Sequence, residues 1–104
     1  KTDMAASVKV TTIGAVPPGT GTVVEAEGVE VALFNVDGRF HAIDNACIHS
    51  GGPLGEGELE GKVVTCPWHC WEFDVESGEC VGVPGGKVDV YSVEIRGEDV
   101  YVSV

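Results

Sequence analysis

Two short motifs, Cys47-Ile48-His49 and Cys66-Pro67-Trp68-His69, contain residue types that bind soft metals. Each motif holds one cysteine and one histidine, and 16 residues lie between the two motifs. Thiolate and imidazole groups suit zinc, copper or an iron-sulfur cluster, whereas magnesium and calcium prefer oxygen ligands. The residue types therefore predict a metal centre and leave the metal open.

The spacing of these residues narrows the choice of metal. A zinc finger with two cysteines and two histidines has its cysteines in one C-x-x-C pair and its histidines in a following helix. Here each motif mixes the two residue types. The chain can then present both thiolates to one iron and both imidazoles to another if the two loops face each other, as in a Rieske centre. A structural zinc module is the alternative from a different functional class.

Runs of alternating apolar and polar residues surround the two motifs. Asp37-Gly38 is a strong signal for a hairpin turn, and residues 44–61 read as a glycine-rich loop. This order predicts a β-meander, an insertion at about residues 45–86 that contains both motifs, and a C-terminal hairpin. We expect strands at residues 8–13, 22–27, 29–36, 39–43, 62–65, 73–75, 80–81, 88–95 and 100–104.

The composition favours a single all-β domain that spans residues 1–104. Apolar residues make up 43% of the 104 positions, and 15 glycines and 5 prolines supply many turns. The longest uncharged run, residues 10–24, is interrupted by prolines and glycines, so a membrane-spanning helix is not expected there. No leader-like segment stands out, and the cytoplasm is the expected location.

The charge of the chain excludes some partners. The formal net charge is −11, from 17 acidic and 6 basic residues, and such a chain repels nucleic acid and anionic lipid. We therefore expect no nucleic-acid and no membrane partner. A protein partner with a basic docking surface is the natural complement. Seven of the acidic residues lie between residues 56 and 79, where they form either such a docking surface or a solvated face.

The two motifs and their neighbours resemble the Rieske ferredoxins and Rieske domains. The signature of that family is C-x-H, a gap of about this length, and then C-P-x-H-G-W-x-F-D-x-x-x-G. The resemblance covers nearly the whole chain. The matching residues are Phe40, Ala42-Ile43-Asp44-Asn45, Cys47, His49, Gly52-Pro53-Leu54-Gly55, Val63-Val64-Thr65-Cys66-Pro67-Trp68-His69, Trp71, Phe73-Asp74 and Gly78.

The resemblance implies an all-β Rieske iron-sulfur domain of three antiparallel sheets, with a cluster-binding insertion of two loops. One Rieske-type [2Fe-2S] cluster is expected at the tip, beside a proline-containing loop around Pro84, with both histidines exposed. All four donors are used by the cluster, so no catalytic residue is expected and the chain is not an enzyme by itself. The implied cluster and metal ligands are Cys47, His49, Cys66 and His69.

The resemblance also indicates which kind of Rieske protein this is. High-potential members carry an extra cysteine in each loop, which form a disulfide, and the matching positions here are Gly52 and Trp68. Those members also have serine and tyrosine hydroxyls that donate to sulfur, where this chain has Trp71 and Phe73. Fewer hydrogen bonds to sulfur lower the reduction potential, so we predict roughly −150 mV.

A low-potential, acidic Rieske ferredoxin is typically the electron-transfer component of a multicomponent aromatic-ring dioxygenase. The resemblance then implies a flavin-dependent reductase as electron donor and a terminal oxygenase as acceptor. The alternative is the Rieske small subunit of an assimilatory nitrite reductase, a group in which the cluster ligands are often absent. All four are present here.

Three further residues with metal-binding side chains remain. Cys70 stands where the family usually has glycine, and a hairpin over Ser77 places Cys80 opposite Phe73 or Asp74 rather than beside Cys70. Free thiols are therefore favoured over a Cys70–Cys80 disulfide, with one thiol packed and the other tolerated. His41 lies on an expected strand with no cysteine near it in sequence, so we interpret it as a solvated strand residue rather than a third ligand.

Overall fold

The computed structural model describes residues 7–49 and 51–104, so residues 1–6 and Ser50 of the expected glycine-rich loop lie outside the described part. Within this part the secondary structure is β-strand and two short 3-10 helices, η2 (Ile13–Ala15) and η3 (Leu54–Glu56), and no helix is long and apolar enough to cross a membrane. The strands are β1 (Ser7–Thr12), β2 (Thr20–Ala26), β3 (Val29–Val36), β4 (Arg39–Asp44), β5 (Glu58–Glu60), β6 (Val63–Thr65), β7 (Glu72–Asp74), β8 (Val90–Arg96) and β9 (Asp99–Ser103).

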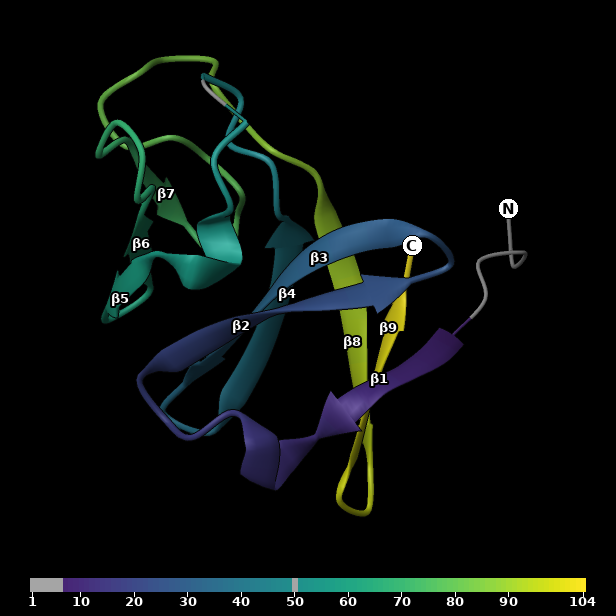
Figure 1. Ribbon diagram of the computed structural model, residues 1–104. Coiled ribbons are helices and arrows are strands. Elements are labelled where there is room, and N and C mark those ends of the chain that lie inside the picture. The colour runs from purple at the N-terminus through teal and green to yellow at the C-terminus, as the bar shows by residue number, and fades with distance from the viewer. Residues whose placement is uncertain (1–6, 50) are drawn as a thin grey trace.

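Six antiparallel strands form the larger part of the molecule, which we call the base (Figure 1). Their order is β1-β9-β8-β4-β3-β2. β4 and β8 meet through only two residue pairs, Ala42 with Tyr91 and Ile43 with Val90. The base is therefore two three-stranded sheets joined by a short seam. Together with the separate sheet described below, this all-β antiparallel arrangement confirms the expected fold class.

The meander β2-β3-β4 follows the sequence pattern closely. β3 begins and ends at the expected residues, and the turn into β4 is at Asp37-Gly38. Both turn residues have positive φ, 53° for Asp37 and 91° for Gly38, as a two-residue hairpin turn of the favoured type requires. The side chain of Asn35 stabilises this end of the meander, because its Oδ1 accepts a hydrogen bond from the Gly38 N–H at 2.7 Å.

Residues 45–89, between β4 and β8, form a smaller body that we call the head. Figure 1 shows it above one end of the base. It contains the antiparallel sheet β5-β6-β7 and several loops. β5 is a correction to the sequence analysis, which placed these residues in a loop. Its pattern, Glu58-Leu59-Glu60, offers a single apolar residue between glycines, and pairing with β6 is what makes it a strand.

β3 connects the two parts by serving two hydrophobic clusters. Because side chains alternate along a strand, Ala32 and Phe34 point into the cluster of the head, whereas Val31 and Leu33 point into the cluster of the base. All four residues are fully buried. This double burial explains why residues 31–34 are apolar without interruption, and it fixes the head on the base.

Candidate metal centre

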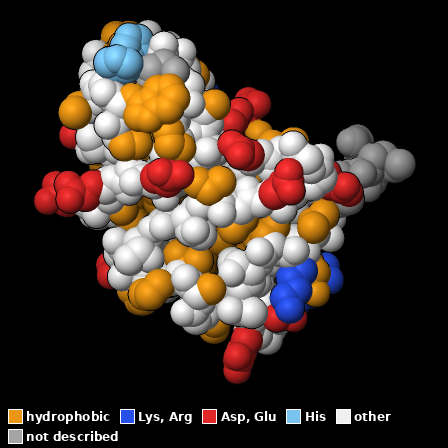
Figure 2. Space-filling view, viewed as in Figure 1, with side chains coloured by type: hydrophobic (Ala, Val, Ile, Leu, Met, Phe, Trp, Pro, Cys, Tyr) orange, Lys and Arg blue, Asp and Glu red, His pale blue; other side chains and the backbone are white. Residues whose placement is uncertain are grey.

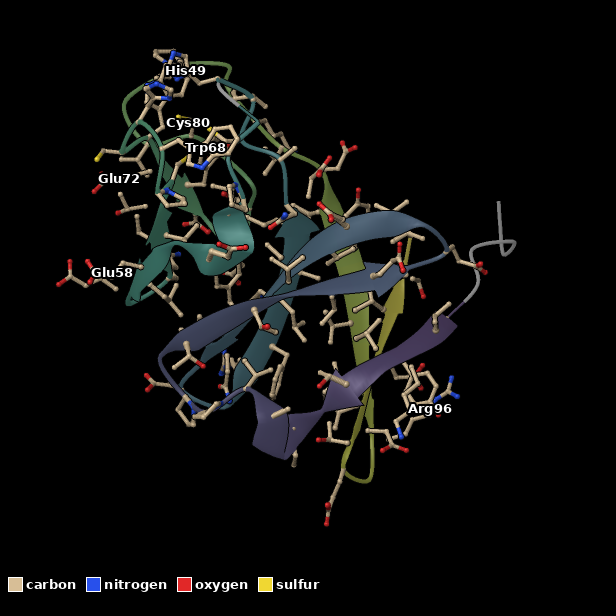
Figure 3. The ribbon with its side chains drawn as sticks, in the orientation of Figure 1. His49, Glu58, Trp68, Glu72, Cys80 and Arg96 are labelled. Atoms are coloured by element: carbon tan, nitrogen blue, oxygen red, sulfur yellow. The ribbon has the colours of Figure 1, made fainter. Side chains whose placement is uncertain are left out.

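The four predicted ligands lie on two loops of the head, with both cysteines in one buried cluster and the two histidine rings in contact. Cys47 and Cys66 are buried in the head cluster, with 3% and 0% of their surface exposed, whereas His49 and His69 are exposed. The two imidazole rings pack edge to face with their centroids 4.9 Å apart. Figure 3 shows His49 at the outermost point of the head. The sequence thus predicted correctly that the histidines are exposed.

The two loops that carry these residues have the same pattern of backbone hydrogen bonds, which we call the loop frame. In the first loop, residues 47–52, the N–H of Cys47 donates to the carbonyl of Gly52 at 3.0 Å, and the N–H of Gly51 donates to the carbonyl of Cys47 at 2.7 Å. In the second loop, residues 66–71, the N–H of Cys66 donates to Trp71 at 2.7 Å, and that of Cys70 donates to Cys66 at 3.0 Å. Each loop therefore curls around the carbonyl of its own cysteine.

This frame explains why a glycine is expected where Cys70 stands. Gly51 and Cys70 occupy the same position in their loops, four residues after the cysteine, and both have positive φ, 76° and 63°. That region favours glycine, because a Cβ atom crowds the backbone there. Cys70 therefore tolerates a conformation that its side chain opposes. Its thiol is exposed and forms no disulfide.

Asn45 stabilises the chain on both sides of the first loop. This buried residue accepts the Leu54 N–H on its backbone carbonyl at 2.7 Å and the Gly55 N–H on Oδ1 at 2.8 Å. Its own N–H donates to the carbonyl of Glu30 on β3 at 3.3 Å. Asn45 thus links residues 54–55 to β3 of the base through its side chain and its backbone together. The residue matches the family pattern, but no role was predicted for it from the sequence. Its position at the end of a strand, before the first motif, was the available signal.

The two loops also touch each other at two places. A Cβ atom on Gly52 would lie 2.7 Å from Sγ of Cys66 and 3.0 Å from the Trp68 ring, so only glycine allows this approach. Gly52 and Trp68, the positions that match the family disulfide, are therefore in contact here as well. At the second place the indole of Trp71 stacks on His49, with centroids 4.3 Å apart. The sequence did not predict this stack.

A third loop, residues 79–87, lies beside the two ligand loops. Cys80 is buried there, and burial raises the pKa of its thiol, with further contributions from Cys47 and Glu72. Cys80 pairs with Phe73 through an isolated β-bridge, as the predicted hairpin requires, and it forms no disulfide. The loop borders a surface hollow of about 390 Å³ that Pro84 helps to line.

His41 lies outside the head, on β4 and in register with Phe34.

The surface around the site combines apolar and acidic groups. Figure 2 shows the histidines at the tip, apolar side chains next to them and acidic side chains lower on the same face. The exposed apolar residues of the head include Trp68, 58% exposed, together with Ile48 and Val81. Trp68 lies just below the tip and Glu72 to its side in Figure 3, whereas Arg96 lies at the opposite end of the molecule.

Asp74 closes the turn below the second loop. Its Oδ1 accepts hydrogen bonds from the N–H groups of Glu76 at 2.8 Å and Ser77 at 3.0 Å, and Lys62 lies 3.5 Å from its Oδ2. Burial raises the pKa of this carboxyl, but the two N–H donors and Lys62 outweigh burial and leave the pKa below its usual value. The carboxylate is therefore ionised at neutral pH and holds the turn that follows β7.

The donor set fits an iron-sulfur centre in its chemistry. Two buried thiols and two adjacent exposed imidazoles offer sulfur ligands on the protein side and nitrogen ligands on the solvent side. Among the described residues no three His, Cys, Asp or Glu side chains gather closely enough to hold one metal ion. The half-buried indole of Trp71, in the second loop, packs against the apolar cluster that contains both thiols and helps to keep water from the sulfur side of such a centre.

The sequence of the chain is similar to proteins of one family. The model of the Rieske [2Fe-2S] domain matches residues 6–94. The ferredoxin component of a naphthalene 1,2-dioxygenase system from Pseudomonas aeruginosa is 36% identical over 90 residues, which is 86% of either chain. The biphenyl dioxygenase ferredoxin subunit from Pseudomonas sp. (strain KKS102) is 38% identical over 96 residues, 90% of this chain and 88% of the relative.

Solved structures share the fold over nearly the full length. A chain in the complex of reduced oxygenase and oxidised ferredoxin in carbazole 1,9a-dioxygenase has a TM-score of 0.85 and 32% identity, and covers 93% of this chain and 92% of its own. A putative NADH-dependent nitrite reductase small subunit from Mycobacterium tuberculosis has a TM-score of 0.89 and 26% identity, and covers 98% of this chain and 97% of its own.

Proposed function

This chain belongs to the Rieske [2Fe-2S] domain family, and from that premise we propose that it is a ferredoxin that passes single electrons between two partner proteins. It carries one Rieske-type [2Fe-2S] cluster. We assign the four ligands to Cys47, His49, Cys66 and His69, within one domain of residues 1–104 whose cluster-binding insertion is about residues 45–86. The support for this assignment is the exposed histidine pair above two buried thiols.

The cluster, when bound, supplies one-electron redox chemistry at a potential that its surroundings set. The chain's own residues hold the cluster and expose one side of it to a partner. Cys47 and Cys66 are held under the loops, away from water, by the backbone hydrogen bonds that each cysteine makes within its loop. His49 and His69 bring the other side of the site to the surface, where a partner can approach closely. The chain itself then needs no substrate pocket, because catalysis belongs to the partner.

The electron acceptor in this proposal is the terminal oxygenase of an aromatic-ring dioxygenase system, and the donor is a flavin-dependent reductase. The names of the naphthalene and biphenyl dioxygenase relatives support the type of system, and the carbazole complex of oxygenase and ferredoxin supports the acceptor. We place the chain in the cytoplasm with these partners. The net charge of −11 suits partners with a basic rim around the contact.

The proposed potential lies at the low end of the Rieske range, roughly −150 mV. Phe73 is fully buried in the head cluster and has no hydroxyl to donate to sulfur. Trp71 offers an indole where a serine hydroxyl stands in the high-potential members. A carrier with this potential can accept electrons from a reduced flavin and pass them to an acceptor of similar or higher potential.

A nitrite reductase small subunit is the second candidate function. The observation that favours it is the TM-score of 0.89 to the nitrite reductase small subunit described above. The two candidates differ in what the chain must do alone. A ferredoxin exchanges electrons as a separate diffusing protein, whereas a subunit works within a stable complex with its catalytic partner.

A stopped-flow experiment tests the proposed function. The iron-loaded chain is reduced and mixed with an aromatic-ring terminal oxygenase in its oxidised form, while the visible absorbance of both proteins is recorded. We expect bimolecular oxidation of the chain, slowed by added salt because the docking charges are exposed. Cys66→Ser should abolish the transfer, and Cys70→Ser, which alters an exposed thiol in the same loop, should retain it. Transfer only to a nitrite reductase catalytic subunit would contradict the first candidate and support the second.

A further inference from the structure

The imidazole of His49 lies flat against the indole of Trp71. The two ring centroids are 4.3 Å apart and the ring planes differ by 7°. His69 meets the same imidazole at 4.9 Å with an angle of 81° between the planes. Both neighbours come from the second loop, whereas His49 comes from the first. His49 is therefore held on two sides by groups of the opposite loop.

Trp71 is itself well fixed. Its backbone carbonyl accepts the hydrogen bond from Cys66 that closes the second loop, at 2.7 Å. The positive φ of Cys70, just before it, turns the chain back toward the head. The half-buried side chain of Trp71 packs against the head cluster. The Trp71 side chain thus contacts both the core and the exposed imidazole, so the indole offers a fixed surface to His49.

We propose that Trp71 is a positioning residue for His49, which fixes the plane of this imidazole and keeps the histidine pair in one arrangement. An exposed histidine ring otherwise samples a broad range about its Cβ–Cγ bond. A parallel aromatic neighbour opposes that rotation, because turning the imidazole breaks the stacked contact. The inference rests on the proposed role of His49 as a ligand, and it assigns to Trp71 a function that shielding and packing do not include.

Trp68 provides a matched control in the same loop. Its indole lies against Gly52 and is 58% exposed, whereas that of Trp71 lies against His49 and is half-buried. If tryptophan acts only by drying the surroundings of the site, replacing either residue should have similar effects. If stacking on His49 matters, only the Trp71 variants should alter the histidine signals.

The experiment compares iron-loaded Trp71→Leu, Trp71→Phe and Trp68→Leu with the unaltered chain. Each protein is labelled with ¹⁵N-histidine, reduced, and measured by electron paramagnetic resonance and by the nitrogen hyperfine couplings of its two histidines. Iron release to a chelator gives a second readout. For Trp71→Leu we expect broadened resonances, a changed coupling for one histidine, and iron release faster by roughly two- to tenfold. Trp71→Phe should restore most of the spectrum, and Trp68→Leu should leave the nitrogen couplings of both histidines unaltered.

Several outcomes would overturn the inference. A Trp71→Leu spectrum and release rate like those of the unaltered chain would do so, as would equal changes in Trp68→Leu. If Trp71→Leu takes up no iron, the Phe variant decides: loading with a nearly unaltered spectrum supports stacking, and failure to load contradicts it. Iron and sulfide content of the unaltered chain separates the two proposals, because a chain without two irons and two sulfides contradicts the ligand assignment itself.

Discussion

The base and the head of this molecule are stabilised in different ways. The base has long, well-paired strands, and β2 and β3 alone pair over seven residue pairs, from Thr20 with Asn35 to Ala26 with Val29. The strands of the head are three residues long, and β6 pairs with each neighbour over three residue pairs. Much of the head is loops whose hydrogen bonds centre on Cys47, Cys66 and Asn45.

The two parts therefore depend on a bound cluster to different degrees. Strand pairing and apolar packing are sufficient to specify the base, so it can support the site without a cofactor. The head keeps two cysteines and two histidines in place through turns, and short strands contribute little stability by themselves. A bound cluster then acts as part of the head's structure, because its ligand bonds join the two loops and add to the apolar packing of the head.

Removal of the cluster should destabilise the head and leave the base nearly as stable as before. This is the largest effect that we expect. Amide hydrogen exchange is measured on the iron-loaded chain and after iron removal with a chelator under reducing conditions. Amides of the head, such as those of Cys66 and Gly57, should lose protection by roughly a hundredfold or more, while those of β2 and β3 remain protected. Equal loss of protection in both parts would show that they unfold as one unit.

Neighbouring residues on β3 allow the comparison to be tested by mutation. Phe34→Ala opens the head cluster and should cost about 3–5 kcal/mol of unfolding free energy, whereas Leu33→Ala opens the base cluster and should cost about 2–5 kcal/mol. The prediction concerns the order of events during urea denaturation. Visible absorbance should be lost before the far-ultraviolet circular dichroism signal in Phe34→Ala, and the two should be lost together in Leu33→Ala.

Phe73→Tyr tests whether the missing hydroxyl sets the potential. Phe73 stands where the high-potential members have a tyrosine that donates to sulfur, and it is fully buried in the same cluster as Cys47 and Cys66. One new hydrogen bond of about 0.5–1.5 kcal/mol to the reduced form should raise the midpoint by roughly 20–65 mV in a redox titration. Phe40→Tyr, which packs against the base cluster, is the control and should leave the midpoint unchanged. A lower midpoint in Phe73→Tyr would contradict the assignment.

Cys70→Gly should give the smallest effect and a favourable one. Glycine removes the Cβ atom that crowds the backbone at φ 63°, so the iron-loaded chain should gain about 1 kcal/mol, seen as a higher urea midpoint. The reverse change in the other loop, Gly51→Ala at φ 76°, should lower the midpoint by a similar amount. A higher urea midpoint for Cys70→Gly together with a lower one for Gly51→Ala would support the loop frame common to both loops. A lower urea midpoint for Cys70→Gly would contradict it.

The sequence predicted the base more completely than the head, for physical reasons. β3 and the turn at Asp37-Gly38 were predicted correctly, because alternation and turn chemistry are local properties of the chain. β5 was wrongly placed in a loop, since its glutamates carry no apolar pattern and only its pairing with β6 defines it. Local patterns describe a strand well only where its own side chains build the core.

In the head, the sequence indicated which residues belong to the site, but it did not predict how they contact one another. Cys70 was recognised as a departure from the family pattern, but the reason came from the loop frame that it shares with Gly51. The stack of Trp71 on His49 joins two residues that are 22 positions apart in the chain, and no periodicity links them. Contacts of this kind depend on how the two loops face each other, which local patterns do not encode.

The assignment of one Rieske cluster to this chain is tested by measuring iron, zinc and acid-labile sulfide in the purified chain, together with electron paramagnetic resonance of its reduced form. We predict two irons and two sulfides per chain, a Rieske-type signal with two histidine nitrogen couplings, and loss of both in Cys66→Ser but not in Cys70→Ser. One zinc per chain, no sulfide and no visible colour would contradict the assignment and identify the chain as a structural zinc module.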